Sequence, residues 1–110
     1  MVDYELNELK REFLDEAREK VAEMQASVES GGRDGAALDR LAYLAHQLKG
    51  SGGSYGYQQI SDDAAELEKA VESLASQNGD GPSLDGKIRR HVGNLRSEIE
   101  NALKELEQVQ

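Results

Sequence analysis

Four stretches of the chain carry apolar or small residues at intervals of three and four, and this spacing constrains the fold more than any other feature. An α-helix places residues at such intervals on one face, which can then be buried. No stretch alternates apolar and polar residues with β-branched enrichment, so strands are not expected. The positions are Leu6, Leu9, Phe13, Ala17, Val21, Met24 and Val28; Leu38, Leu41, Ala45, Leu48, Gly52 and Tyr55; Ile60, Ala64, Leu67, Val71 and Leu74; and Leu84, Ile88, Val92, Leu95, Ile99, Ala102 and Leu106.

Short links containing glycine separate these stretches, at roughly 31–35, 56–57 and 78–82. Asp3 is the expected N-cap of the first helix and Ser83 that of the fourth, because short polar side chains satisfy free backbone N–H groups there. Short connections between long helices make neighbouring helices antiparallel. We therefore predict an all-α fold, an antiparallel up-down-up-down four-helix bundle that forms a single domain over residues 1–110.

Charge and composition exclude several classes of function. The 110 residues include 13 Lys and Arg against 22 Asp and Glu, a net charge of −9 that argues against a nucleic-acid surface. The absence of cysteine excludes disulfides and thiolate metal sites. No Glu-x-x-His pair occurs, so the di-iron bundle pattern is missing and no metal site is expected. The sequence shows no apolar run that could cross a bilayer and no signal peptide. We expect a cytoplasmic monomer with no membrane partner.

The segment "AHQLKGSGGSYGY", residues 45–57, concentrates glycine in a stretch that otherwise reads as helix. A glycine in a helix interior costs about 1 kcal/mol relative to alanine. On a helical wheel His46 lies about 140° from the core direction, and a face of little bulk surrounds it. Such a face lets a partner approach the backbone closely, although a frayed helix end beside an inconsequential surface histidine would also explain the glycines. Besides His46 and the neighbouring Lys49, the residues expected at the partner-binding face are Ala42, Gly50, Gly53 and Tyr57.

A carboxylate is expected opposite this histidine. If the chain reverses near residues 56–57, His46 lies level with Glu68 across the helical hairpin. A carboxylate on one imidazole nitrogen fixes the tautomer and leaves the other nitrogen with a free lone pair, as a nucleophile requires. The alternative is that Glu68 is an ordinary surface charge. His91 lacks a following lysine and glycine, and we interpret it as a histidine on a helix flank.

The run His46-Gln47-Leu48-Lys49-Gly50-Ser51, followed by Gly56, resembles the motif of histidine-containing phosphotransfer (HPt) domains, His-x-x-Lys-Gly-small. Domains of that family are four-helix bundles of about this length with the phosphorylated histidine exposed on the second helix. The run Lys-Gly-Ser-Gly-Gly-Ser-Tyr-Gly-Tyr is most similar to the phosphotransfer domain of chemotaxis-type histidine kinases. There a glutamate of the next helix hydrogen-bonds the histidine, and Glu68 falls at that position.

The resemblance implies a phosphocarrier without catalytic activity of its own. His46 would accept the phosphoryl group, Lys49 would stabilise its charge, and Glu68 would orient the imidazole. The partners would be response-regulator receiver domains, with a histidine kinase as a possible further partner, and Mg²⁺ would come from the receiver rather than from this chain. Two alternatives stay open: a fragment of a larger chemotaxis-type kinase charged from ATP by another domain, and an adaptor bundle that carries no phosphate.

Overall fold

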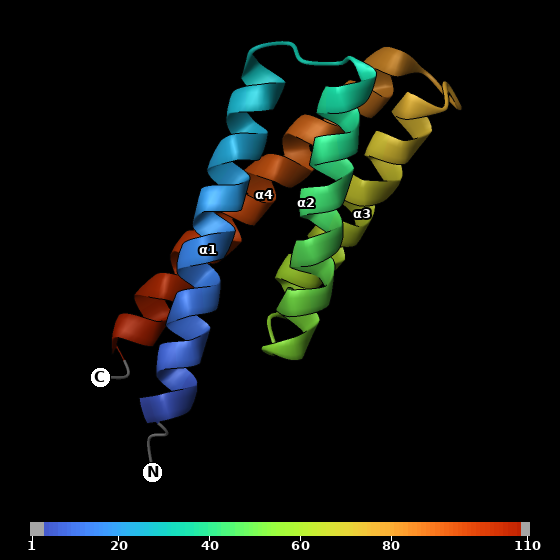
Figure 1. Ribbon diagram of the computed structural model, residues 1–110. Helices are drawn as coiled ribbons and strands as arrows, with labels where there is room; N and C mark the ends of the chain where they lie inside the picture. The colour runs from blue at the N-terminus through green and yellow to red at the C-terminus, as the bar shows by residue number, and fades with distance from the viewer. Residues whose placement is uncertain (1–3, 109–110) are drawn as a thin grey trace.

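Four helices make up the computed structural model, which describes residues 4–108. They are α1 (Tyr4–Glu29), α2 (Gly35–Ser54), α3 (Gln58–Ala75) and α4 (Gly81–Gln108). Each helix packs against two neighbours, in the pairs α1–α2, α2–α3, α3–α4 and α1–α4 (Figure 1). Between residues 4 and 108 there is no strand. The predicted all-α four-helix bundle is confirmed.

The core is built from the apolar faces that the three- and four-residue spacing predicts. Leu41, Leu48, Leu67, Ile88 and Leu95 are at most 1 % exposed. Each helix also buries residues beside the predicted line, because a helix surrounded by two neighbours covers a wider stripe than one row of side chains. These additional buried residues are Leu14, Leu44, Ala70 and Leu103.

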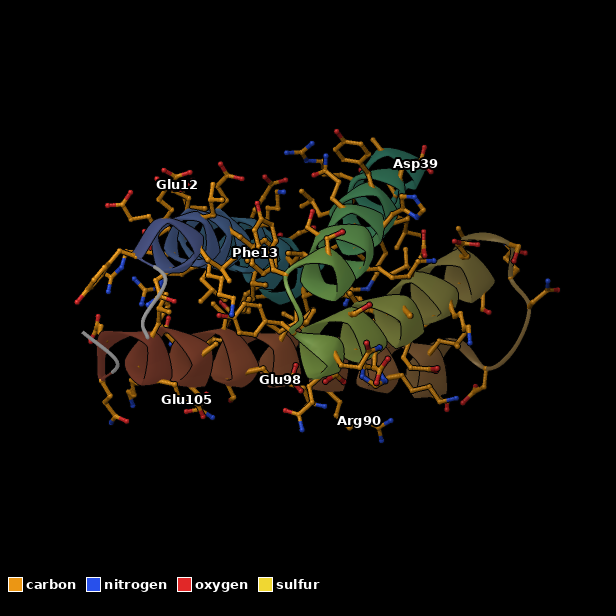
Figure 2. All side chains as sticks on the ribbon, turned by 90° about the horizontal axis from the view of Figure 1, so that it is seen from below. Glu12, Phe13, Asp39, Arg90, Glu98 and Glu105 are labelled. Atoms are coloured by element: carbon orange, nitrogen blue, oxygen red, sulfur yellow. The ribbon has the colours of Figure 1, made fainter. Side chains whose placement is uncertain are left out.

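The amino-terminal end of α1 departs from the prediction. Leu6 and Leu9 are 41 % and 48 % exposed, although their spacing placed them in the core. With 26 and 28 residues, α1 and α4 are longer than α2 and α3, with 20 and 18. The first turns of α1 and the last turns of α4 therefore run side by side past the end of the α2–α3 hairpin (Figures 1 and 2). No second pair of helices covers this end. The proposed N-cap Asp3 lies outside the described residues.

The first three helices end in the same local structure. In each, the backbone N–H groups of two successive residues donate to carbonyls of the last turn, and the first of these two residues has a positive φ. Gly31 (φ 78°) and Gly56 (φ 84°) fill this position after α1 and α2, where glycine has no Cβ to strain. Gln77 (φ 58°) fills it after α3. The reversals that the glycines predicted are thus present, and they make sequential helices antiparallel.

Helix α4 begins earlier than predicted, and Ser83 is not its N-cap. The Asp80 carboxylate accepts a hydrogen bond from the Ser83 backbone N–H at 3.2 Å, and the Asp80 carbonyl accepts from Leu84 N–H at 2.9 Å. Asp80 therefore caps the helix, and Pro82 lies in the first turn, where the missing N–H of proline costs nothing. Asp80, two positions before Pro82, thus marks the start of α4 better than Ser83, the residue after the proline.

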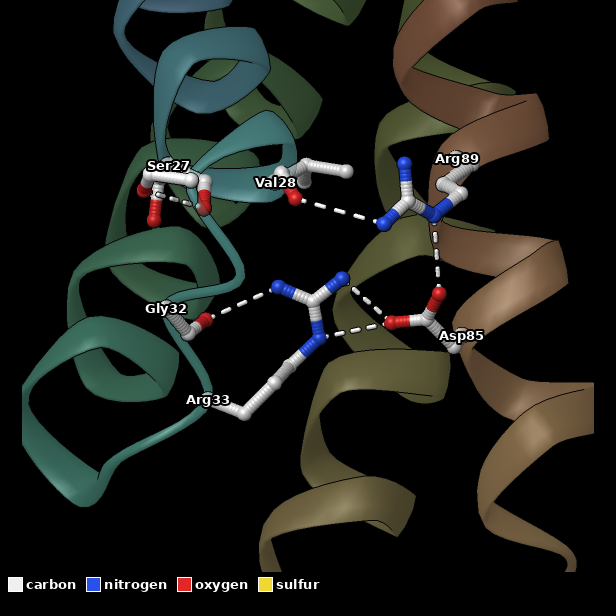
Figure 3. A network of polar contacts seen from close by, with 7 residues as sticks. Ser27, Val28, Gly32, Arg33, Asp85 and Arg89 are labelled. Atoms are coloured by element: carbon white, nitrogen blue, oxygen red, sulfur yellow. Dashed lines mark hydrogen bonds and ion pairs between the residues drawn. The ribbon is translucent and has the colours of Figure 1, made fainter.

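A network of arginines fastens the α1–α2 link to α4 (Figure 3). Arg33, in the link, forms an ion pair with Asp85 of α4 and donates to the Gly32 carbonyl at 2.9 Å. Arg89 donates to the second Asp85 oxygen at 2.8 Å and lies 3.4 Å from the carbonyl of Val28 at the end of α1. Hydrogen bonds from Arg89 and Arg33 lower the pKa of Asp85 below its usual value. The network joins three elements at the end of the bundle far from residues 54–58.

Candidate functional site

His46 lies in the second half of α2, with its side chain directed out of the bundle and 66 % exposed. Its Nδ1 is 2.9 Å from Oε2 of Glu68 on α3. The two residues are 22 positions apart in sequence and meet because α2 and α3 form an antiparallel hairpin. Glu68 is only 16 % exposed, so the less mobile partner of the pair is the carboxylate.

Lys49, one turn after His46, contacts the same carboxylate. Its Nζ donates to Oε1 of Glu68 at 3.2 Å, so the two Glu68 oxygens are divided between the imidazole and the ammonium group. The Lys49 side chain is 43 % exposed. A positive charge is therefore held within reach of the exposed imidazole face while still accessible to solvent. The structure brings His46, Lys49 and Glu68 together in one polar cluster.

The Glu68 contact determines which imidazole nitrogen is free. An ionised carboxylate can only accept hydrogen bonds, so Nδ1 of His46 carries the hydrogen. Nε2 then keeps its lone pair. Among the described residues Nε2 has no hydrogen-bond partner. The arrangement leaves one nucleophilic nitrogen facing outward from α2.

Small residues lie on the His46 face of α2 after the histidine, whereas Tyr43, one turn before it, is a large side chain that is 53 % exposed. Gly50 and Gly53 are exposed, and Ala42 is half-buried against the core. A Cβ added at Gly50 would meet no atom within 4 Å, so packing inside the bundle does not require glycine there. At Gly52, by contrast, an added Cβ would lie 3.2 Å from the backbone nitrogen of Ser61. The glycines of this segment therefore serve two purposes, close helix packing at Gly52 and open surface at Gly50.

Tyr57 does not lie on the face of His46. The wheel that placed it there assumed a helix continuing through residue 57, but α2 ends at Ser54 and the chain turns at Gly56. The Tyr57 ring instead stacks on Phe13 of α1, with ring centroids 5.9 Å apart, and Tyr55 stacks on the same ring at 5.1 Å. Figure 2 shows Phe13 directed inward between α1 and the end of α2. The helical wheel that predicted Tyr57 at the partner-binding face therefore does not apply to this residue.

A second polar cluster between α3 and α4 was not anticipated. His91, whose side chain is 12 % exposed, has Nδ1 2.8 Å from Oδ1 of Asp63, and Asn94 donates to the same oxygen at 3.2 Å. Burial, and then a hydrogen bond with Asp63, raises the pKa of Glu98 from its ordinary 4.5 to about 8. Burial alone would raise the pKa of Asp63 as well, but hydrogen bonds from Glu98, His91 and Asn94 lower it. A protonated Glu98 therefore faces an ionised Asp63.

The Glu98 carboxyl makes the stability of the bundle depend on pH. Between about pH 4.5 and pH 8 the folded protein holds a proton that the unfolded chain has released. The stabilising contribution is therefore fully present below pH 4.5 and is lost as pH rises towards 8. Glu98→Gln keeps a hydrogen-bond donor towards Asp63 at every pH. We expect the denaturation midpoint of this variant to exceed that of the wild type increasingly as pH rises through this range.

Urea denaturation of both proteins, followed by circular dichroism at several pH values, measures this difference. Glu107→Gln removes an exposed carboxylate from the same helix and is the matched control, with a constant offset from the wild type expected. Parallel curves for Glu98→Gln and the wild type would show that Glu98 carries no extra proton in the folded state.

Two further observations concern metal binding and membrane spanning. Across residues 4–108 no group of three or more histidine, cysteine, aspartate or glutamate side chains is arranged to hold a metal ion. None of the helices in that range combines the length and the apolar character needed to span a bilayer.

The four-helix bundle displays an exposed histidine, His46, beside the ammonium group of Lys49 and the carboxylate of Glu68. The sequence profile of the Hpt domain matches residues 8–109, and the chain belongs to this family. No curated protein and no solved structure matches the chain. Membership implies histidine phosphotransfer in phosphorelay signalling by a module that has no catalytic activity of its own, with receiver domains and kinases as the usual kinds of partner.

Proposed function

We propose that His46 accepts a phosphoryl group on Nε2 and exchanges it with the aspartate of a receiver domain. The observation that carries this proposal is the 2.9 Å contact between His46 Nδ1 and Glu68, made by an imidazole that is 66 % exposed. The contact leaves the outward nitrogen with its lone pair. Exposure lets a folded partner bring a phosphoryl group in line with that nitrogen.

The transfer exchanges a phosphorus–oxygen bond on the receiver for a phosphorus–nitrogen bond on His46. The Nε2 lone pair attacks the phosphorus of the aspartyl phosphate, and the phosphorus–oxygen bond to the receiver's carboxylate breaks. The aspartate leaves as a carboxylate with the bonding electrons. The hydrogen on Nδ1 stays in place, so the phosphorylated ring becomes positively charged. Glu68, held at Nδ1, balances this charge, and the reverse step returns the group to a second receiver.

Lys49 supplies charge stabilisation for the phosphoryl oxygens. Its ammonium group is held by Glu68 on the same side of α2 as the imidazole, and it is partly exposed. Gly50, with Ala42 and Gly53, keeps the surface around His46 low enough for close approach of the receiver. The Mg²⁺ and the acceptor aspartate belong to the receiver in this scheme, so the chain needs no cofactor. We further propose that it acts as a monomer in the cytoplasm.

A kinase domain is the alternative source of the phosphoryl group. The motif from Lys49 to Tyr57 is similar to that of the phosphotransfer domain of chemotaxis-type histidine kinases. In such a protein the phosphoryl group comes from ATP through a separate kinase domain. An adaptor that binds receivers without carrying phosphate is the remaining alternative, and for it the chemistry of His46 would be irrelevant.

A transfer assay distinguishes these possibilities. Receiver domains are charged with a small phosphodonor and Mg²⁺ and mixed with this protein, and the intact mass is followed. One acid-labile, alkali-stable phosphate per chain is expected. Transfer from a histidine kinase with ATP, but from no receiver, would favour the kinase-charged form. A folded protein that takes phosphate from neither source would leave the adaptor.

A further inference from the structure

Helices α2 and α3 approach each other unusually closely at Gly52 and Ser61. Gly52 is buried, and a Cβ there would lie 3.2 Å from Ser61 N, 3.3 Å from Ile60 Cγ2 and 3.4 Å from Tyr57 O. Two of these atoms, Ser61 N and Tyr57 O, are backbone atoms at the start of α3, which cannot rotate away as a side chain can. The 3.2 and 3.3 Å distances are tighter than ordinary van der Waals contact, so a methyl group at position 52 would displace the facing atoms by a few tenths of an ångström.

A hydrogen bond fixes the same contact along the helix axes. Ser61 Oγ donates to the backbone carbonyl of Lys49 at 2.8 Å. This carbonyl belongs to a residue of the His46 cluster, so the bond ties the amino-terminal part of α3 directly to the segment of α2 that carries the candidate site. The glycine sets how closely the helices approach, and the serine sets how far one can slide past the other.

The contact lies about two helical turns from the His46–Glu68 pair on both helices. His46 and Gly52 are six positions apart, and Ser61 and Glu68 are seven positions apart; at 1.5 Å per residue these are axial distances of roughly 9 and 10.5 Å. Because the two distances nearly match, the register fixed at Gly52 and Ser61 is also the register that brings Glu68 level with His46. A displacement at one contact is transmitted to the other through two rigid helices.

We propose that Gly52 and Ser61 are positioning residues that hold the Glu68 carboxylate against His46 Nδ1 and thereby fix the imidazole tautomer. The proposal rests on the proposed function of His46 for its significance in phosphotransfer. The tautomer itself can be measured without any transfer. Gly52→Ala forces the helices apart by a few tenths of an ångström, and Ser61→Ala removes the bond to Lys49 without adding bulk.

The test is the ¹⁵N spectrum of the imidazole rings, recorded above the titration range of histidine. In the wild type the chemical shifts of His46 should report hydrogen on Nδ1. In Gly52→Ala and Ser61→Ala we expect the Nδ1–H fraction to fall towards the value found in Glu68→Ala, and the rate of phosphoryl transfer to fall several-fold. His91, bonded to Asp63 between α3 and α4, is an internal reference whose shifts should not change.

Gly53→Ala is the matched control. It adds the same methyl group one residue later in α2, where the nearest atom, Ser61 Oγ, would lie at an ordinary 3.7 Å. Its tautomer should equal that of the wild type; its transfer rate is not compared, because Gly53 also lies on the face proposed to meet the receiver. Unchanged His46 shifts in folded Ser61→Ala and Gly52→Ala would overturn the positioning role; if Gly52→Ala does not fold, Ser61→Ala alone decides. Failure of the wild type to accept phosphate would refute the proposed function and leave the tautomer result standing.

Discussion

The His46→Gln variant is expected to take up no phosphoryl group from any donor while keeping the fold of the bundle. Glutamine has no nucleophilic nitrogen, because its amide lone pair is delocalised, so the acceptor is lost completely. The side chain of His46 is 66 % exposed and contributes one hydrogen bond, to Glu68. Its loss should therefore change the free energy of unfolding by about 1 kcal/mol or less. Intact mass after incubation with charged receivers, together with helical circular dichroism, measures both effects.

The second histidine provides the control for this experiment. His91 also has a carboxylate at Nδ1, but its side chain is only 12 % exposed and packs between α3 and α4. His91→Gln should therefore keep full uptake, although it perturbs the hydrogen bonds of Asp63. Uptake that survives in His46→Gln and disappears in His91→Gln would reverse the assignment of the acceptor. A marked loss of helix in His46→Gln would contradict the outward placement of the residue.

Lys49→Ala is expected to slow phosphoryl transfer by roughly tenfold without preventing it. Removing one charge-stabilising donor from an enclosed site costs about a hundred- to a thousandfold in rate. The Lys49 side chain is 43 % exposed, and solvent screening reduces its effect on the phosphoryl oxygens. The nucleophile and its hydrogen bond to Glu68 remain, so transfer should still reach completion. Single-turnover transfer from a charged receiver gives the rate directly.

Lys69→Ala is the matched control for the loss of charge. Lys69 is a 75 % exposed lysine on α3 that contacts Glu66 at 3.5 Å and forms no hydrogen bond or ion pair with His46. Both variants lower the net charge of the protein by one unit, so a general electrostatic effect on receiver binding would slow them equally. Equal rates for Lys49→Ala and the wild type would remove Lys49 from the mechanism. A rate that falls in Lys49→Ala alone would assign the effect to the phosphoryl group.

The regular part of the fold could be predicted from the sequence because it depends on local periodicity. Apolar spacing located all four helices, and glycines at 31 and 56 marked two of the reversals. Periodicity cannot show whether another helix covers a given turn. Leu6 and Leu9 follow the pattern of a core face, yet they are exposed because α1 extends beyond the end of the α2–α3 hairpin.

In the candidate site, too, contacts within one helical hairpin could be predicted from the sequence, and contacts that depend on helix packing could not. Glu68 could be placed opposite His46 because a tight hairpin relates residues of α2 and α3 by simple counting, and the structure has the two side chains in contact. Tyr57 was misplaced because the wheel was extended past the end of the helix. The cluster of Asp63, His91 and Glu98 depends on the rotation of α3 against α4, which no spacing in the sequence records.

The position of the phosphate within the protein is the most direct test of phosphotransfer through His46. The protein is labelled with ¹⁵N, charged by a receiver domain, and examined by long-range ¹⁵N and ³¹P spectroscopy of its imidazole rings. We expect a single phosphorus bonded to Nε2 of His46, with the hydrogen on Nδ1 retained. Phosphate on Nδ1 of His46, on His91 or on a side chain other than histidine would contradict it.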